Sequence, residues 1–276
     1  MCYFNVSIRR LSSISVFVFM LVFSLSFSVS VKAEQIVDNQ TWTEILQRYV
    51  DHKGLVDYKG LIDNRESFDR YVSSIEKVSP DSNPELFSSP AQSLAYYLNA
   101  YNAQVVKGVL ARGPEQESVW KGWISGLAFF VRMDIIIGGN NTNLKELEDD
   151  IIRARYKDPR VHAALNCASI GCPRLIREAY SAEKLEQQLD AAVSEFLNGE
   201  MYVRIDGEKK QVWLSKIFDW YEKDFLRYET RNGNTGKNKD RKLIDYVNRY
   251  RAADHQIPDD YDVKILKYDK RINHQS

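Results

Sequence analysis

The chain has 276 residues, and its 38 lysines and arginines balance its 38 aspartates and glutamates. Without a basic excess, neither nucleic acid nor an anionic membrane surface is indicated as a partner. The length is sufficient for one substantial domain with its own core.

The N-terminal segment has the layout of a secretory signal peptide. Two arginines precede a long apolar run with scattered serines, and Val31 and Ala33 occupy the small-residue positions of a cleavage site. We expect residues 1–33 to be removed and residues 34–276 to form a single globular domain that is periplasmic or secreted. The run is also long enough to span a bilayer, so a membrane contact is expected only if this segment is retained as an anchor.

Apolar periodicity and capping residues predict a mostly helical chain. Short apolar runs and the Asp206-Gly207 turn add a few strands, two of them in a hairpin. The fold class is therefore α+β, with a small and largely antiparallel sheet. The expected helices cover residues 41–53, 60–77, 90–111, 142–153, 181–198, 215–225 and 243–251, and the expected strands cover 131–137, 161–167, 201–205, 211–214 and 263–268.

The segment VHAALNCASIGCPRL contains the residues best suited to chemistry. If its first part is a strand, His162 and Cys167 point to opposite faces, whereas the turn that follows can bring Cys172 back towards His162. Pro173 keeps Cys172 extended and is favoured at the start of a helix, where free N–H groups lower a thiol pKa. Cys172 is thus the candidate nucleophile and His162 its base.

Structural interpretations of the same residues are equally consistent with the sequence. Cys167 and Cys172 are the only cysteines beyond the signal segment, and an oxidising compartment favours a disulfide between them. His162 alone on an apolar strand is more often a hydrogen-bonded core residue. A metal held by these three side chains lacks a fourth ligand at ordinary zinc spacing, so neither a metal nor another cofactor is expected.

Three further polar positions come from the flanking helices. Asn99 and Asn102 share one face of the longest helix, where they can either pin a neighbouring loop or line a pocket. Glu148 lies beside a packed stripe and can hydrogen-bond a histidine, pair with Arg153 or face solvent. In LSKIFDWYEKDF the aromatic residues are expected to be core, and Asp224 is expected to be an ion-pair partner.

These motifs together resemble a known family. YLNAYNAQVV, NLKELEDDIIR, RVHAALNCASIGCPRL and LSKIFDWYEKDF occur in this order, between YVDHKGLVDY and ILKYDKRIN. The pattern is similar to that of the domain-of-unknown-function family 547 (DUF547) over nearly the whole mature chain. The family pattern commonly has histidine where this chain has Asp149. The positions that the resemblance marks are Asn99, Tyr101, Asn102, Glu148, His162, Cys167, Ser169 and Cys172.

The resemblance brings no assigned activity, and it implies, by analogy, a distant likeness to papain- or transglutaminase-like enzymes. The first hypothesis is an extracytoplasmic thiol hydrolase or acyltransferase acting on an unknown small molecule or peptide. Asn99 or Asn102 would orient the imidazole or donate to an oxyanion, with Glu148 as a weaker orienting candidate. The second hypothesis is a cell-envelope binding or scaffold domain with a Cys167–Cys172 disulfide. A thiol-disulfide oxidoreductase ranks last, since C-x4-C differs from the usual C-x2-C.

Overall fold

The structure is a computed structural model, and it describes residues 37–113, 115–120, 127–234 and 238–275. The expected signal segment lies outside the described residues. Within these ranges, no helix has the length and apolar character needed to cross a bilayer.

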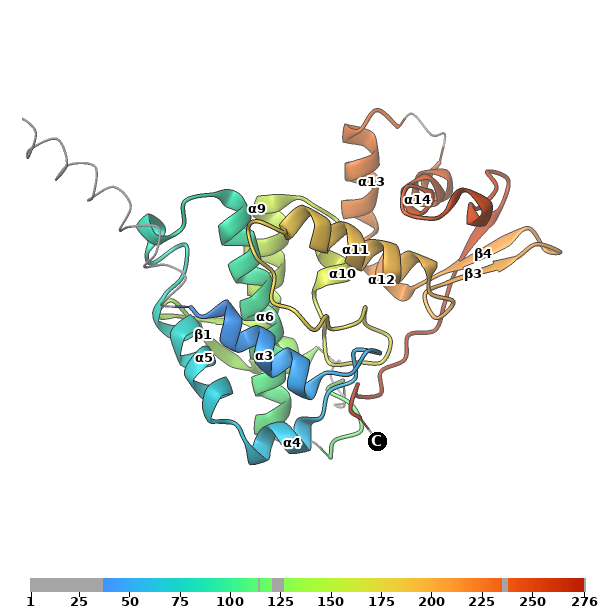
Figure 1. Cartoon of the computed structure of the whole chain (residues 1–276). Coiled ribbons are helices and arrows are strands. Elements are labelled where there is room, and N and C mark those ends of the chain that lie inside the picture. Colours follow the sequence, from blue (N-terminus) through green and yellow to red (C-terminus); the bar gives the residue numbers. More distant parts are fainter. Residues whose placement is uncertain (1–36, 114, 121–126, 235–237, 276) are drawn as a thin grey trace, which may run out of the picture.

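Helices make up most of the described chain (Figure 1). Their bounds are α3 Asn39–Tyr49, α4 Tyr58–Asp63, α5 Glu66–Lys77, α6 Pro90–Arg112, α7 Ala128–Arg132, α8 Leu144–Glu146, α9 Ala154–Tyr156, α10 Val161–Ala164, α11 Leu185–Asn198, α12 Lys216–Trp220, α13 Glu222–Arg231 and α14 Lys239–Asn248. A π-helical stretch, η2, joins α8 to α9 over Leu147–Arg153, and short 3-10 turns lie at Pro84–Leu86 and Ala253–His255.

The described strands form one two-stranded and one three-stranded sheet. β1 (Asp134–Ile137) pairs antiparallel with β2 (Asn140–Asn143). β3 (Val203–Asp206) and β4 (Gln211–Leu214) form the expected antiparallel hairpin. β5 (Asp262–Ile265) pairs parallel with β4. The α+β class is therefore confirmed, with the strands divided between two sheets rather than collected in one.

Helix α6 forms the centre of the larger part of the molecule. Ser89 caps it by accepting a hydrogen bond from the Gln92 amide, Pro90 occupies the first turn, and Gly113 ends it with a positive φ of 96°. Most of its residues are buried, so side chains from every face of the helix contribute to the core. This is why polar groups on α6 must find partners inside the protein.

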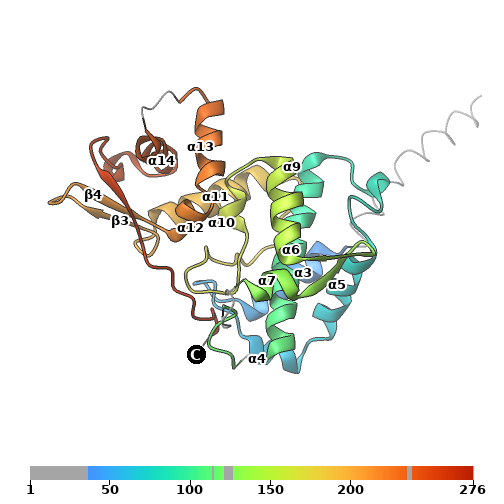
Figure 2. The ribbon, with the colours of Figure 1, turned by 180° about the vertical axis from the view of Figure 1, so that it is seen from behind.

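The buried residues form two clusters. One gathers around α3, α5 and α6, and the other packs β3, β4, α13 and α14 against the second half of α11. Figures 1 and 2 show these groups of elements at opposite ends of the molecule, with α11 reaching both. After β5 the chain returns to the first cluster, where Asn273 accepts a hydrogen bond from the Tyr58 hydroxyl at 2.7 Å and its carbonyl accepts from the Val56 amide.

Several predicted elements differ from the observed ones. Residues 161–167 were expected to be a strand, and the structure instead has α10 followed by an extended segment. Pro173 does not begin a helix, because residues 173–179, all of which are described, are not helical. Of the expected strand 131–137, the first residues belong to α7. Such short apolar runs fit either periodicity, so tertiary contacts decide between them.

Candidate functional site

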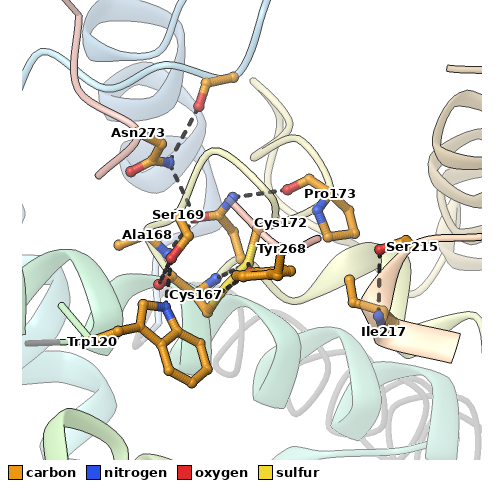
Figure 3. Close-up of a disulfide and its surroundings, with 12 residues drawn as sticks. Trp120, Cys167, Ala168, Ser169, Cys172, Pro173, Ser215, Ile217, Tyr268 and Asn273 are labelled. Atoms are coloured by element: carbon orange, nitrogen blue, oxygen red, sulfur yellow. Dashed lines mark hydrogen bonds between the residues drawn. A yellow bond between two sulfur atoms is a disulfide. The ribbon is translucent and has the colours of Figure 1, made fainter. Parts of the chain in front are cut away.

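The two cysteines are joined by a disulfide (Figure 3). The Cα atoms of Cys167 and Cys172 lie 6.2 Å apart. The Cys167 amide donates to the Cys172 sulfur at 2.9 Å. The Tyr268 hydroxyl lies 3.0 Å from the Cys167 sulfur and 3.1 Å from that of Cys172. Of the alternatives considered for the two cysteines, the structure contains the disulfide. Cys172 therefore has no free thiol in this state. Neither sulfur is then a thiolate, which is the form of cysteine that binds a metal ion.

The disulfide loop is held by buried amides. Asn166 donates through its side-chain nitrogen to the Pro173 carbonyl at 2.8 Å, which closes the loop. Its oxygen accepts from the Ala168 amide at 2.9 Å and from the Asn273 side chain at 3.2 Å. Ala168 has a φ of 58°, an unusual conformation for a residue other than glycine. These contacts fix the loop independently of the sulfur–sulfur bond.

The backbone at His162 is helical because a helix begins just before it. The Asp158 carboxylate accepts from the Arg160 amide at 2.9 Å, and the Pro159 carbonyl accepts from the His162 amide at 3.2 Å. An Asp-Pro pair is a typical helix start, and it outweighed the apolar run that predicted a strand. The alternation of faces that we expected for His162 and Cys167 is therefore wrong.

The imidazole of His162 packs against the C-terminal cluster. It is 4% exposed, and its Nε2 lies 3.0 Å from Asp224 Oδ2. The ring stacks on Tyr221 with 4.0 Å between centroids. In the described ranges, no hydrogen bond joins this imidazole to either cysteine sulfur. The proposed direct Cys172–His162 pair is thus not formed in the disulfide state.

Asp224 is the carboxylate that orients the histidine. Its Oδ2 also accepts a hydrogen bond from Arg153 Nε at 2.8 Å, which confirms the predicted ion-pair role. Burial alone would raise the Asp224 pKa, but hydrogen bonds with His162 and Arg153 outweigh burial and lower this pKa to about 2. Asp224 is therefore ionised throughout the physiological range.

Glu148 occupies a different position from the one expected. Its carboxylate accepts hydrogen bonds from the Tyr101 hydroxyl at 3.0 Å and the Tyr221 hydroxyl at 2.5 Å, so it is Asp224, not Glu148, that contacts the histidine. Burial raises the pKa of both tyrosine hydroxyls well above the ordinary tyrosine value, and the charge of Glu148 is the second cause. Both hydroxyls therefore remain donors. Among the described residues, no lysine, arginine or histidine nitrogen lies within ion-pair distance of Glu148.

The two asparagines on α6 pin backbone segments. Asn99 donates to the Tyr180 carbonyl at 2.8 Å and accepts from the Tyr180 amide at 2.9 Å. Asn102 donates to the Ala164 carbonyl at 3.0 Å and accepts from the Asn166 amide at 2.9 Å. Both amides are buried. Asn102 fixes the backbone that follows His162, and Asn99 fixes the backbone at Tyr180.

A pocket of about 600 Å³ brings several of these groups together. Three of the candidate residues line it, namely His162, Cys172 and Glu148, whereas Asn99 and Asn102 do not. Its walls combine aromatic and charged side chains. The lining residues are Tyr101, Trp120, Leu127, Phe130, Lys145, Glu148, Asp149, Arg153, His162, Leu165, Cys167, Cys172, Ile217, Trp220, Tyr221, Tyr268 and Lys270.

The middle of the chain, residues 86–197, matches the family model described as "Protein of unknown function, DUF547". Residues 86–197 belong to the DUF547 family. No curated protein and no solved structure matches the chain, so the expected likeness to papain- or transglutaminase-like enzymes stays an expectation.

The DUF547 match contains every position that the resemblance marked, from Asn99 to Cys172. In place of the histidine common in the DUF547 pattern, Asp149 forms ion pairs with Lys145 and Arg153. Through Arg153, this residue is linked to Asp224 and so to the histidine. Asp149 therefore acts here as a charge partner of Lys145 and Arg153 in the pocket wall.

Part of the pocket lies beyond the DUF547 match and was not expected to line a site. These residues are Ile217, Trp220, Tyr221, Tyr268 and Lys270. Trp220 was expected to be core, yet it is 39% exposed and faces the pocket. Tyr268 belongs to the closing motif ILKYDKRIN and reaches both sulfurs. This motif was part of the family resemblance, and that could have marked Tyr268 as a candidate site residue. The segment that carries it returns to the first core cluster and so brings Tyr268 to the disulfide.

Proposed function

We propose that this protein is an extracytoplasmic binding domain that holds a small organic ligand in the pocket whose wall contains the Cys167–Cys172 disulfide. Two features support the location. Residues 1–33 have the pattern of a signal peptide, and a protein disulfide persists in oxidising compartments.

The observation that carries the proposal is the disulfide in the pocket wall. A thiolate is needed for nucleophilic attack, and a disulfide-bonded Cys172 cannot supply one. The imidazole of His162 is engaged with Asp224. A pocket of about 600 Å³ has the size typical of small-molecule sites, and its aromatic faces together with a few polar and charged groups suit the binding of a ligand.

The redox state can be tested on the full chain carrying Cys2→Ser, in which only Cys167 and Cys172 can report. We expect no titratable thiol in denatured protein purified without reductant, and two after reduction. Two rapidly alkylated thiols in the non-reduced protein would contradict the proposal.

Ligand binding can be tested with a matched pair of tryptophans. Trp220 lines the pocket and is 39% exposed, while Trp213 on β4 is 37% exposed and lies outside it. A fragment library should contain compounds that raise the melting temperature of the wild type and of Trp213→Ala but not of Trp220→Ala. Equal loss in both variants, or no binder at all, would count against a binding pocket.

A second candidate function, a thiol hydrolase or acyltransferase, is favoured by one specific arrangement. Cys172 and His162 line the same pocket, and Asp224 orients the imidazole as a carboxylate does in a catalytic triad. After reduction, the Cys172 thiolate would attack an acyl carbon while His162 passes a proton to the leaving group, with Asn99 and Asn102 as positioning residues.

This second candidate is tested on protein reduced with dithiothreitol. It predicts that iodoacetamide modifies Cys172 faster than Cys167, and that His162→Ala slows the modification of Cys172 near neutral pH. The catalytic hypothesis fails if both cysteines react at the rate of an ordinary exposed thiol in the wild type and in His162→Ala. The binding proposal is unaffected by that result.

A further inference from the structure

We infer that the pocket selects small organic cations, with an ammonium group beside Glu148 and an apolar body against the aromatic walls. This inference rests on the proposed binding function, and it names the class of ligand.

Among the described residues around the pocket, the side-chain charges cancel except at Glu148 and Lys270. Lys145 pairs with Asp149, and Arg153 pairs with Asp149 and Asp224, so these four groups neutralise one another. Glu148 is left with two neutral tyrosine donors and, in the described part of the chain, no cationic partner. A carboxylate that is half-buried and lacks a cation is a ready acceptor for a charged donor, because each of its oxygens has a second lone pair.

The remaining charge, Lys270, does not cancel that of Glu148. Its ammonium lies 5.2 Å from the centre of the Trp120 ring, and the side chain is exposed. Solvent and salt screen an exposed charge far more than a half-buried one. The field inside the pocket is therefore dominated by Glu148, and it favours a cation.

The walls supply the second element of cation recognition. Trp120 and Trp220 stack with 5.6 Å between centroids, and Tyr268 packs against both. Lys270 above Trp120 shows that an aromatic face at the pocket accepts an ammonium group. Together, a carboxylate and several aromatic faces in one pocket fit an amine that carries an apolar group. Figure 3 shows Trp120 and Tyr268 beside the disulfide that forms part of this wall.

The test compares three probes of one shape, namely tryptamine (cation), tryptophol (neutral) and indole-3-propionate (anion), titrated by calorimetry into the full-length protein. We expect tryptamine to bind tightest. Glu148→Gln should weaken tryptamine about tenfold or more and change tryptophol by less than about twofold, because only the charge-assisted interaction is lost. The matched control is Glu146→Gln, which removes one exposed carboxylate outside the pocket and should change neither.

The outcomes separate this inference from the proposed function. If tryptophol or indole-3-propionate binds as tightly as tryptamine, the cation preference is wrong while the binding pocket stands. If no probe and no library fragment binds, the proposed function itself fails. If Glu148→Gln does not fold, the affinities of the three probes for the wild type test the cation preference. The advantage of tryptamine over the other two probes should then decrease as salt is added.

Discussion

The imidazole of His162 and the carboxylate of Asp224 lie 3.0 Å apart, although 62 residues separate them in the chain. This contact joins α10 to α13 and places the histidine at the boundary between the two core clusters. Arg153 completes the arrangement from the π-helical stretch η2. The same three residues therefore hold the pocket wall and connect the two parts of the fold.

The Asp224 contacts predict a defined loss of stability in acid. The Asp224 pKa is about 2 in the folded protein and near 4 when unfolded, so its contribution is complete above about pH 4 and is lost as the pH falls towards 2. A shift of this size corresponds to about 2 kcal/mol in the free energy of unfolding. The difference between wild type and Asp224→Asn, measured by urea unfolding from pH 7 to pH 2, should shrink over that window.

The control for this experiment is Asp219→Asn, which removes an exposed carboxylate paired with Lys216. It should change the free energy of unfolding by less than about 1 kcal/mol at either pH. A pH-independent difference between wild type and Asp224→Asn would contradict the assigned role.

Removing the disulfide should weaken the fold moderately. Cys167 and Cys172 are five residues apart, and closing so short a loop restricts the unfolded chain by about 2 kcal/mol. We expect Cys167→Ala/Cys172→Ala to lower the free energy of unfolding by this amount while keeping a native circular dichroism spectrum, because Asn166 also holds the loop. Complete unfolding of the double variant would show that the amide contacts alone cannot hold this loop.

Asn102→Ala tests the pinning of the loop by α6. The substitution removes hydrogen bonds to the Ala164 carbonyl and the Asn166 amide and leaves both buried groups without these partners. We expect a loss of about 2 to 3 kcal/mol in urea unfolding. Asn64→Ala, which removes an exposed contact to the Gly60 carbonyl, should stay within about 0.5 kcal/mol. Similar losses in both variants would refute a specific role for Asn102.

Gly108→Ala should destabilise a helix that alanine ordinarily favours. Alanine exceeds glycine in helix propensity by about 1 kcal/mol. In α6, however, a Cβ at this position would overlap the Met133 side chain and lie 2.8 Å from Phe129 Cζ, within a packed core. Overpacking should outweigh propensity and give a net loss of about 1 to 2 kcal/mol, measured by thermal unfolding. A higher melting temperature would show that the core can accommodate the added methyl group.

Long periodic segments were predictable from the sequence alone. Helix α6 begins at Pro90 as expected and ends one residue later than predicted, and its two asparagines pin neighbouring backbone, one of the two roles anticipated for them. Such a segment repeats its apolar pattern over many turns, and proline and glycine mark its ends. The β3–β4 hairpin was predicted on similarly local grounds.

The sequence by itself determined the helical framework, the pair of cysteines and the polar residues near them. Only the tertiary structure decided that the cysteines bond to each other, that His162 faces Asp224, and that Glu148 faces two tyrosines. The reason is physical. Residues 161–164 are too few to fix a helical or a strand period, so the direction of the His162 ring depends on partners from distant segments. These partners meet only when α13 packs beside α10 in the second core cluster and the C-terminal segment returns to the first.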